Sequence, residues 1–282
     1  MATVGFLGTG LLGGAMVEGM LRRGDEVTVW NRTESKARAL EQFGAAVAAS
    51  PGDAVAGADH VHLVLPDDAV VDQIVAAITP RLRPGAVIID HSTTSPRGTK
   101  ARLDEMQKAG VKFLHAPVFM SPPMARDGVG MMLASGPQDV FDEMLDELEK
   151  MTGEVWYVGE QGDLAAAYKI FGNSMLFVIA AGVSDVFAMA KGLGIAPTDA
   201  LAVFGKFQPG NLIQSRGDKM ARGDFSATFE LTMARKDMRL MLDAAAGQPM
   251  TVLPAIAKAM DDAIAKGHGQ DDLGAIAAEV VK

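Results

Sequence analysis

Short apolar segments alternate with longer segments of helical periodicity through the first half of the chain. The short segments predict strands at 3–7, 26–30, 60–65, 86–90 and 112–115. The longer segments predict helices at 11–23, 35–43 and 68–79. Because strand–helix alternation is typical of βαβ units, we expect a parallel sheet with right-handed crossovers. A strand at 131–134, a helix at 138–151 and a strand at 154–158 complete this predicted α/β domain.

The pattern changes after residues 159–162, Gly-Glu-Gln-Gly, which lack periodicity and are typical of a hinge. No strong helix breaker follows between 164 and 193, which predicts one helix of about 45 Å. The remaining sequence favours helices alone, roughly at 198–206, 212–222, 232–246, 252–266 and 271–281. We therefore expect an α/β domain at 1–162, a long connecting helix at 163–194 and an all-helical domain at 195–282.

The long helix contains an uncharged stretch of 15 residues, 170–184, which includes Asn173 and two glycines. A membrane-spanning helix needs about 20 predominantly apolar residues, so we expect a buried helix here and no membrane partner. The chain starts directly with a strand and a glycine-rich turn, without a basic leader and an apolar secretory segment. This start favours a cytoplasmic protein.

Composition narrows the classes of function. Lys and Arg number 26 against 35 Asp and Glu, a formal net charge of −9, which argues against nucleic acid or an anionic membrane as the main partner. The absence of cysteine excludes disulfides, thiolate metal sites and a cysteine nucleophile. The five histidines have no HxxxH or HExxH spacing, so we expect no metal site.

A glycine-rich turn after the first expected strand, Gly8-Thr9-Gly10-Leu11-Leu12-Gly13, matches G-x-G-x-x-G. In this motif Gly8 permits the tight turn, Gly10 lets the backbone approach a pyrophosphate, and Gly13 lets the helix pack on the strand. Leu11 and Leu12 begin the helix, whose amino end faces the anion. A turn without a ligand is the alternative, but the strand before it and the helix after it favour a dinucleotide site in a doubly wound, Rossmann-type domain.

The end of the second expected strand distinguishes the two nicotinamide cofactors. An NAD enzyme places Asp or Glu there to hold the ribose 2′-hydroxyl, whereas this chain has Asn31, Arg32 and Thr33. Arg32 supplies a fixed charge and a planar donor fork for a 2′-phosphate, and the other two residues add neutral donors. An ordinary surface arginine is the alternative. Because no acidic residue is present, the sequence favours NADP(H).

One lysine and one asparagine stand on the long helix at its expected domain junction. Lys169 and Asn173 are four residues apart and therefore share a face of a helix that is otherwise apolar. A lone lysine at a helix start more often points to solvent. An apolar helix must be buried, however, and a protonated amine beside a ketone or aldehyde donates a proton to the oxygen as hydride reaches the carbon. Lys169 is thus a candidate proton donor.

Five segments together resemble the β-hydroxyacid dehydrogenase family, which includes 3-hydroxyisobutyrate dehydrogenases and glyoxylate/succinic semialdehyde reductases. They are LGTGLLGGAM at 7–16, VTVWNRT at 27–33, IDHSTTSP at 89–96, GDLAAAYKIFGNSM at 162–175 and ARKDMRL at 234–240. The resemblance covers essentially the whole chain. It implies that Lys169 is the catalytic lysine and Asn173 the substrate-holding asparagine. It also implies that Thr93 lines the nicotinamide site, that Lys236 closes over the cofactor, and that Leu65 and Pro66 contact it.

One segment departs from the family. A Ser-Gly-Gly-like turn, whose backbone N–H groups hold a substrate carboxylate, is replaced here by Phe119, Met120 and Ser121. Phe119 and Met120 are expected to fill this part of the substrate pocket with apolar surface, and the alternative is that both side chains turn into the core. Ser121 keeps a small polar group, which makes it a candidate for the polar lining of the substrate pocket. The following Pro-Pro-Met resembles imine reductases, which share the fold but usually lack the lysine found here at 169.

These observations predict an NADP(H)-dependent oxidoreductase acting on a small β-hydroxyacid, aldehyde or ketone, with Lys169, Asn173 and Ser121 at the reacting centre. An imine reductase with the same cofactor is one alternative, and a non-catalytic NADP(H)-binding domain is another. Lys169 argues against the second, because a domain without catalysis does not need that amine. A long apolar helix in an all-helical domain is poorly covered by one chain, so we also expect a homodimer or homotetramer.

Overall fold

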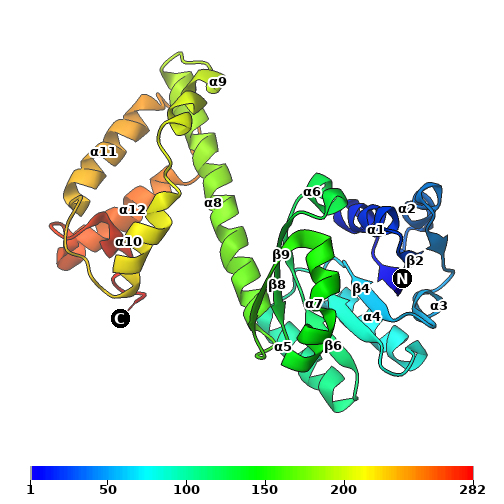
Figure 1. Ribbon diagram of the computed structural model, residues 1–282. Coiled ribbons are helices and arrows are strands. Elements are labelled where there is room, and N and C mark those ends of the chain that lie inside the picture. Colours follow the sequence, from blue (N-terminus) through cyan, green and yellow to red (C-terminus); the bar gives the residue numbers. More distant parts are fainter. Residues whose placement is uncertain (1, 282) are drawn as a thin grey trace. The chain divides into compact units, whose positions relative to one another are not determined.

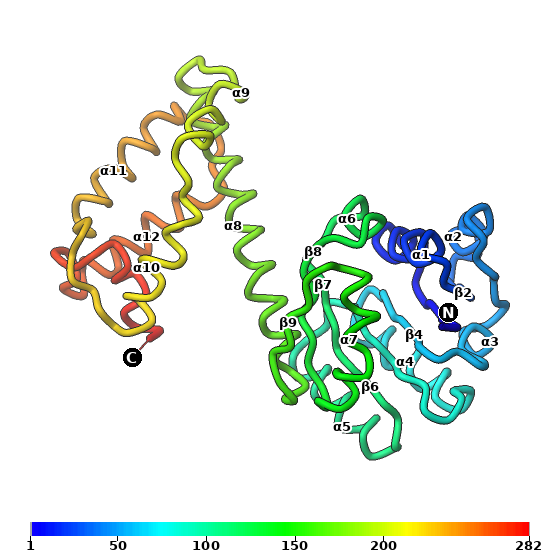
Figure 2. The backbone as a smooth tube through the Cα atoms, viewed as in Figure 1, coloured from blue at the N-terminus to red at the C-terminus, as the bar shows by residue number. Residues whose placement is uncertain are grey.

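The computed structural model describes residues 2–281 and divides into two compact units, with the division after Asn173. The division lies within the long helix α8 (Leu164–Gly192), which follows the last strand of the first unit (Figure 2). Each unit has its own core and is described separately below.

The first unit contains one nine-stranded sheet (Figure 1). Its strands are β1 (Thr3–Leu7), β2 (Glu26–Trp30), β3 (Ala46–Val47), β4 (His60–Leu63), β5 (Val87–Asp90), β6 (Lys112–His115), β7 (Val118–Phe119), β8 (Gly130–Ser135) and β9 (Gly153–Gly159). The strand order is β3-β2-β1-β4-β5-β6-β8-β7, with β9 paired to β8. The six strands from β3 to β6 are all parallel, in the order of a Rossmann domain, which confirms the predicted fold class.

The sheet is mostly parallel, as predicted, and its antiparallel pairs all involve β8. β8 runs antiparallel to β6 and β7 and parallel to β9. Only two residues separate β6 from β7, and a parallel crossover needs a dozen or more. The two strands therefore continue in one direction, and both pair with the same antiparallel neighbour.

Helices cover both faces of this sheet (Figure 1). One layer contains α1 (Leu11–Arg23), α6 (Pro122–Asp127) and α7 (Gln138–Thr152), over a core with Phe6, Met20 and Met144. The other contains α3 (Pro51–Val55), α4 (Asp68–Ile78) and α5 (Pro96–Lys108), over a core with Leu63 and Phe113.

The predicted helix at 35–43 is two short helices in the structure, α2 (Glu34–Arg38) and a 3₁₀ turn at Glu41–Phe43. The short elements β3, α3, β7 and α6, and the helix α5, had no sequence prediction.

The helix beginnings in this unit differ in how their backbone N–H groups are satisfied. Asp67 caps α4 by accepting from Val70 N at 3.0 Å, and Ser95 caps α5 by accepting from Gly98 N at 3.1 Å. The residue before α1 is Gly10, which has no side chain to do this. The amino end of α1 therefore keeps its backbone donors available for an anion.

The second unit is helical throughout its described residues. After α8 come α9 (Pro197–Ala200), a 3₁₀ turn (Leu201–Gly205), α10 (Asn211–Ala221), α11 (Leu231–Ala244) and α12 (Leu253–Ala263). Leu231, Met238 and Met260 join α11 and α12 in a small core. Asp185 of α8 accepts from Thr251 N, from Val252 N at 2.9 Å and from Leu253 N at 2.8 Å, and so caps α12. The helix expected at 271–281 is only a 3₁₀ segment at Leu273–Ala277.

The middle of α8 is poorly covered by the described part of this chain, as the sequence predicts for a single copy. Phe171 is 60% exposed, Leu176 54% and Phe177 71%. By length and composition this helix could cross a membrane, and only 6% of its most apolar window is buried. An apolar helix in this state needs a covering partner.

Candidate active site

A cavity of about 610 Å³ opens where the parallel strands of the first unit end. Its walls come from four places: the glycine-rich turn after β1, the end of β2 with the start of α2, the segment after β4, and one face of α4. The lining residues are Gly8, Gly10, Leu11, Leu12, Trp30, Asn31, Arg32, Thr33, Lys36, Val64, Leu65, Pro66, Val70, Gln73 and Ile74. We call this space the cofactor cavity, because open α/β sheets bind ligands at this edge.

The glycines of the turn have three different physical roles. Gly8 has a φ of +100°, and a Cβ there would lie 2.1 Å from Val64 O. A Cβ at Gly13 would lie 2.0 Å from Gly8 O, so this glycine allows the close approach of helix and turn and stands behind the cavity. A Cβ at Gly10 would meet no protein atom within 4 Å. The space beside Gly10 is therefore open to a ligand, as a pyrophosphate cradle requires.

Two cations line the cavity, and the nearby carboxylate of Glu34 pairs with Arg38 instead. Arg32 and Lys36 both line it, and within residues 2–281 neither forms a salt bridge. Lys36 was not among the predicted site residues, although its position in the first turn after Thr33 was a usable signal. Two such cations favour a ligand with a negatively charged group at this point.

Asn31 forms two hydrogen bonds within the protein, and its expected role as a donor to the cofactor stays a prediction. Its Oδ1 accepts from Thr9 N at 3.1 Å, and its Nδ2 donates to Thr33 O at 2.9 Å. The side chain therefore ties the end of β2 to the glycine-rich turn. It shapes the cavity, and Arg32 and Lys36 are left as the charged donors.

Lys169 lies near the start of α8, where it is buried rather than directed to solvent. Its side chain is 9% exposed, and its Nζ donates to Val118 O at 2.7 Å. The same Nζ lies 3.9 Å from the centroid of the Phe119 ring. Burial lowers the pKa of the Lys169 ammonium from its usual 10.5 to about 8. An ammonium with this pKa is charged at neutral pH and is a stronger acid than an exposed lysine.

Phe119 and Met120 point to opposite sides of β7, because side chains alternate along an extended strand. Met120 packs against the core beneath α1 and α7, and a Cβ at Gly130 would lie 2.9 Å from its Cβ. Phe119 instead faces α8, where a Cβ at Gly172 would lie only 2.4 Å from its Cζ. The ring thus occupies the space between Lys169 and Gly172, and only Phe119 changes the surroundings of the amine.

The other predicted site residues lie in several different elements. Asn173 is half-buried one turn after Lys169, and Ser121 is exposed immediately before α6. Thr93 is exposed in the segment after β5 and does not line the cofactor cavity. Lys236 belongs to the second unit, where its Nζ lies 2.7 Å from Asp237 Oδ1. The roles of these four residues remain predictions.

The comparisons with known proteins follow this division. Residues 3–159 match the model for the NAD-binding domain of 6-phosphogluconate dehydrogenase. Residues 164–280 match the model described as NAD-binding of NADP-dependent 3-hydroxyisobutyrate dehydrogenase. The chain belongs to the β-hydroxyacid dehydrogenase family. Membership of this family makes the protein an NAD(P)-dependent oxidoreductase and confirms the resemblance that the sequence motifs indicated.

Individual relatives of this family member divide into three kinds. Glyoxylate/succinic semialdehyde reductase 1 of Arabidopsis thaliana is 28% identical over 97% of this chain and 96% of its own length. The cytokine-like nuclear factor N-PAC of Homo sapiens is 25% identical over 97% of this chain, but the match spans only 50% of that longer protein. A Streptomyces aurantiacus imine reductase superposes with a TM-score of 0.90 at 25% identity, over 99% of this chain and 100% of the other.

Proposed function

We propose that this protein is an NADPH-dependent reductase of small ketones and aldehydes, with Lys169 as the proton donor. The observation that carries the proposal is the buried Lys169 ammonium beside Val118 O, with its pKa lowered to about 8. Bound NADPH would supply the hydride. Lys169 Nζ has three protons, and Val118 O accepts one of them, which leaves donors for a substrate oxygen while the carbonyl holds the amine in place.

NADPH rather than NADH is favoured by Arg32 and Lys36, the two cations of the cofactor cavity that have no carboxylate partner in the described chain. A ribose 2′-phosphate would accept hydrogen bonds from the Arg32 guanidinium. The uncapped amino end of α1 and the open space at Gly10 suit the pyrophosphate. Asn173, on the Lys169 face of α8, would orient the substrate.

The Phe119 ring favours substrates without a free carboxylate. A carboxylate pressed against this ring loses its hydration without gaining donors, which costs several kcal/mol. Ketones, keto esters and imines do not carry that charge. An imine reductase is the second candidate, because the same ring stands where the family's Ser-Gly-Gly turn presents backbone donors, and because an imine reductase superposes on the whole chain.

The experiment that tests this function is a spectrophotometric screen of the purified protein with NADPH and with NADH. The panel contains glyoxylate, succinic semialdehyde, a β-keto acid, its ethyl ester, an aryl ketone and a cyclic imine. The proposal expects oxidation of NADPH with at least one carbonyl compound, faster than oxidation of NADH. Turnover of imines alone supports the second candidate, and NADPH binding without any turnover supports a non-catalytic domain.

The exposed apolar middle of α8 supports a homodimer or homotetramer, in which a second copy of the chain covers this helix. The residues to be covered include Phe171, Leu176 and Phe177, and a soluble monomer seldom exposes a continuous patch of that kind. Light scattering coupled to gel filtration should give twice or four times the mass of 29.6 kDa. A monomer in buffer that binds to neutral lipid vesicles would instead identify the helix as a membrane contact.

A further inference from the structure

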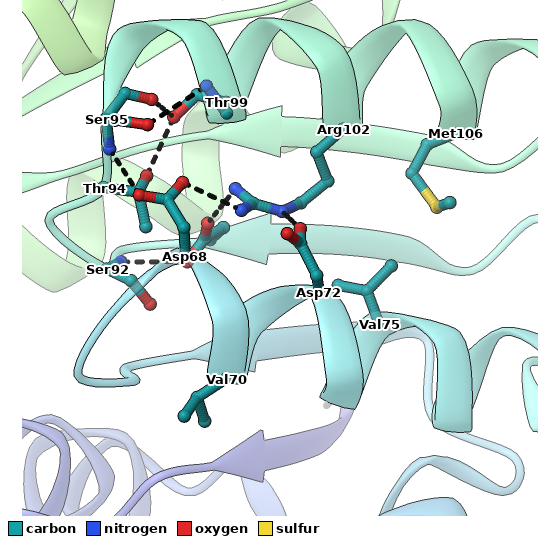
Figure 3. Close-up of polar contacts among 12 residues, drawn as sticks. Asp68, Val70, Asp72, Val75, Ser92, Thr94, Ser95, Thr99, Arg102 and Met106 are labelled. Atoms are coloured by element: carbon teal, nitrogen blue, oxygen red, sulfur yellow. Dashed lines mark hydrogen bonds and ion pairs between the residues drawn. The ribbon is translucent and has the colours of Figure 1, made fainter.

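A buried arginine behind the cofactor cavity lies within ion-pair distance of three carboxylates, two of which, Asp68 and Asp72, are labelled in Figure 3. Arg102 of α5 has a side-chain exposure of 2%, and its Nε lies 2.7 Å from Asp72 Oδ1. Its Nη2 lies 3.2 Å from Asp68 Oδ1, and its Nη1 lies 3.6 Å from Asp90 Oδ2. We call Arg102 and these three aspartates the Arg102 cluster.

Two of the carboxylates connect the guanidinium to a wall of the cavity. Asp68 and Asp72 are four residues apart on α4, so they share the face of that helix that points toward α5 (Figure 3). The same helix lines the cavity with Val70, Gln73 and Ile74. Arg102 therefore holds α4 from behind, and a displacement of this helix changes the width of the cavity.

The third carboxylate connects the guanidinium to the strand ends. Asp90 Oδ1 accepts from Ser92 N at 2.9 Å, and Ser92 Oγ accepts from Leu65 N at 2.9 Å. Leu65 lines the cavity beside Pro66. Burial raises the pKa of the Asp90 carboxyl, but His115 and Ser92 outweigh this effect and lower it overall. The carboxylate therefore stays ionised and available to Arg102.

A glycine at the start of α5 makes the close approach of the two helices possible. Asp68 Oδ2 accepts from Ser95 N at 2.9 Å, which places the carboxylate at the amino end of α5. A Cβ on Gly98 would lie only 2.3 Å from Asp68 Oδ1. The same Cβ would lie 2.8 Å from Ser95 Oγ, so a larger residue at 98 displaces the Asp68 carboxylate most and the Ser95 hydroxyl less, without any change in charge.

We propose that Arg102 is a positioning residue for cofactor binding, which fixes α4 and the end of β4 at the distance from the glycine-rich turn that the cofactor requires. A buried ion cluster gives little net stability compared with apolar residues of the same volume. The hydrogen bonds from Nε to Asp72 and from Nη2 to Asp68 are directional and allow few geometries, and Asp90 adds an ion pair at 3.6 Å without a hydrogen bond. Asp68 and Asp72 belong to α4, which lines the cavity. Asp90 is connected to the lining residue Leu65 through hydrogen bonds to Ser92. This inference rests on the proposed use of NADPH, and it assigns part of the NADPH affinity to the Arg102 cluster.

Two variants change the cluster by different physical means. Arg102→Lys keeps the charge but removes the fork that reaches three carboxylates, and Gly98→Ala displaces Asp68 while it leaves every charge in place. The control is Lys100→Met, which breaks the exposed pair between Lys100 Nζ and Asp104 Oδ2 at 3.0 Å on the same helix. The dissociation constant of NADPH is measured by fluorescence titration well below each variant's melting temperature, which is recorded separately.

We expect both cluster variants to weaken NADPH binding by about tenfold, which corresponds to about 1.4 kcal/mol, while the control stays within about twofold of the parent. A purely structural role lowers the melting temperature and the folded fraction, but it leaves the dissociation constant of the folded molecules unchanged. NADPH affinities equal to that of the control in both variants would overturn the inference. A parent protein that does not bind NADPH would instead overturn the proposed function itself.

Discussion

Replacing Phe119 by serine should move the alkaline limb of the pH–rate profile upward. In the proposed mechanism, carbonyl reduction needs the protonated amine of Lys169, so its rate should fall as the pH rises through about 8, the lowered pKa of this group. The ring excludes water from one side of the ammonium at 3.9 Å. Serine would let water reach the amine and weaken the desolvation that lowers this pKa.

Two effects of the ring oppose each other, and their magnitudes decide the sign. Loss of the cation–π contact removes about 0.5–2 kcal/mol of stabilisation of the charged form, which lowers the pKa by at most about 1.5 units. Rehydration of the ammonium acts in the other direction, because it reverses part of the desolvation that lowers the pKa from 10.5 to about 8. The serine hydroxyl would also lie near the amine and favour its charged form. Desolvation of buried lysines reaches about 3–5 units. We therefore expect a net rise of about one unit.

The assay is kcat/KM for reduction of a β-keto ester at saturating NADPH, measured from about pH 6 to about pH 10. Met120→Leu is the matched control, because Met120 packs into the core on the other side of β7 and does not contact the amine. A limb that stays in place or moves downward in Phe119→Ser would show that the ring does not set the acidity of Lys169. A parent profile without a limb near pH 8 would contradict the role of Lys169 as the acid.

Three further results are expected. Arg32→Ala should weaken NADPH binding by about 1.5–3 kcal/mol, and Lys36→Ala should weaken it by less. NADH binding should stay nearly unchanged in both variants. Equal losses for both cofactors in fluorescence titrations would contradict a 2′-phosphate site. Phe119→Ser alone should shift kcat/KM from a keto ester toward the matching keto acid, whereas Met120→Gly should mainly cost about 2–5 kcal/mol of stability in urea denaturation. Asp185→Ala should destabilise the second unit by about 2–3 kcal/mol. Burial raises the pKa of Asp185, but three backbone N–H groups lower it overall, so its contribution should be lost only as the pH falls below about 4.

The sequence predicted the elements that carry strong local signals. The strands at 3–7 and 26–30 and the helix at 11–23 have the predicted bounds, because apolar periodicity and a glycine-rich turn specify them locally. The helix α5 was missed because it is mostly polar, although Ser95-Pro96 is a usual helix start. Without that helix, Arg102 had no predicted neighbours, and the Arg102 cluster required the fold.

The orientation of Phe119 also depended on tertiary structure. Alternation along a strand says that Phe119 and Met120 face opposite sides, but only the pairing of β7 with β8 determines which of them faces Lys169. For α8, apolar composition predicted burial against a second copy of the chain, but not which residues of that copy cover it. Periodicity reports that a face must be covered, and in this protein the chain itself leaves that face exposed.

The most direct test of the central claim compares the parent with Lys169→Met at saturating NADPH and with the best carbonyl substrate of the screen. Methionine keeps the length and apolar stem of the lysine but has no proton to donate. The account predicts an unchanged dissociation constant for NADPH and a fall in kcat of about 10²–10⁴-fold, the usual contribution of a general acid. A variant that binds NADPH normally and retains near-parental kcat would contradict the assignment of Lys169 as the proton donor.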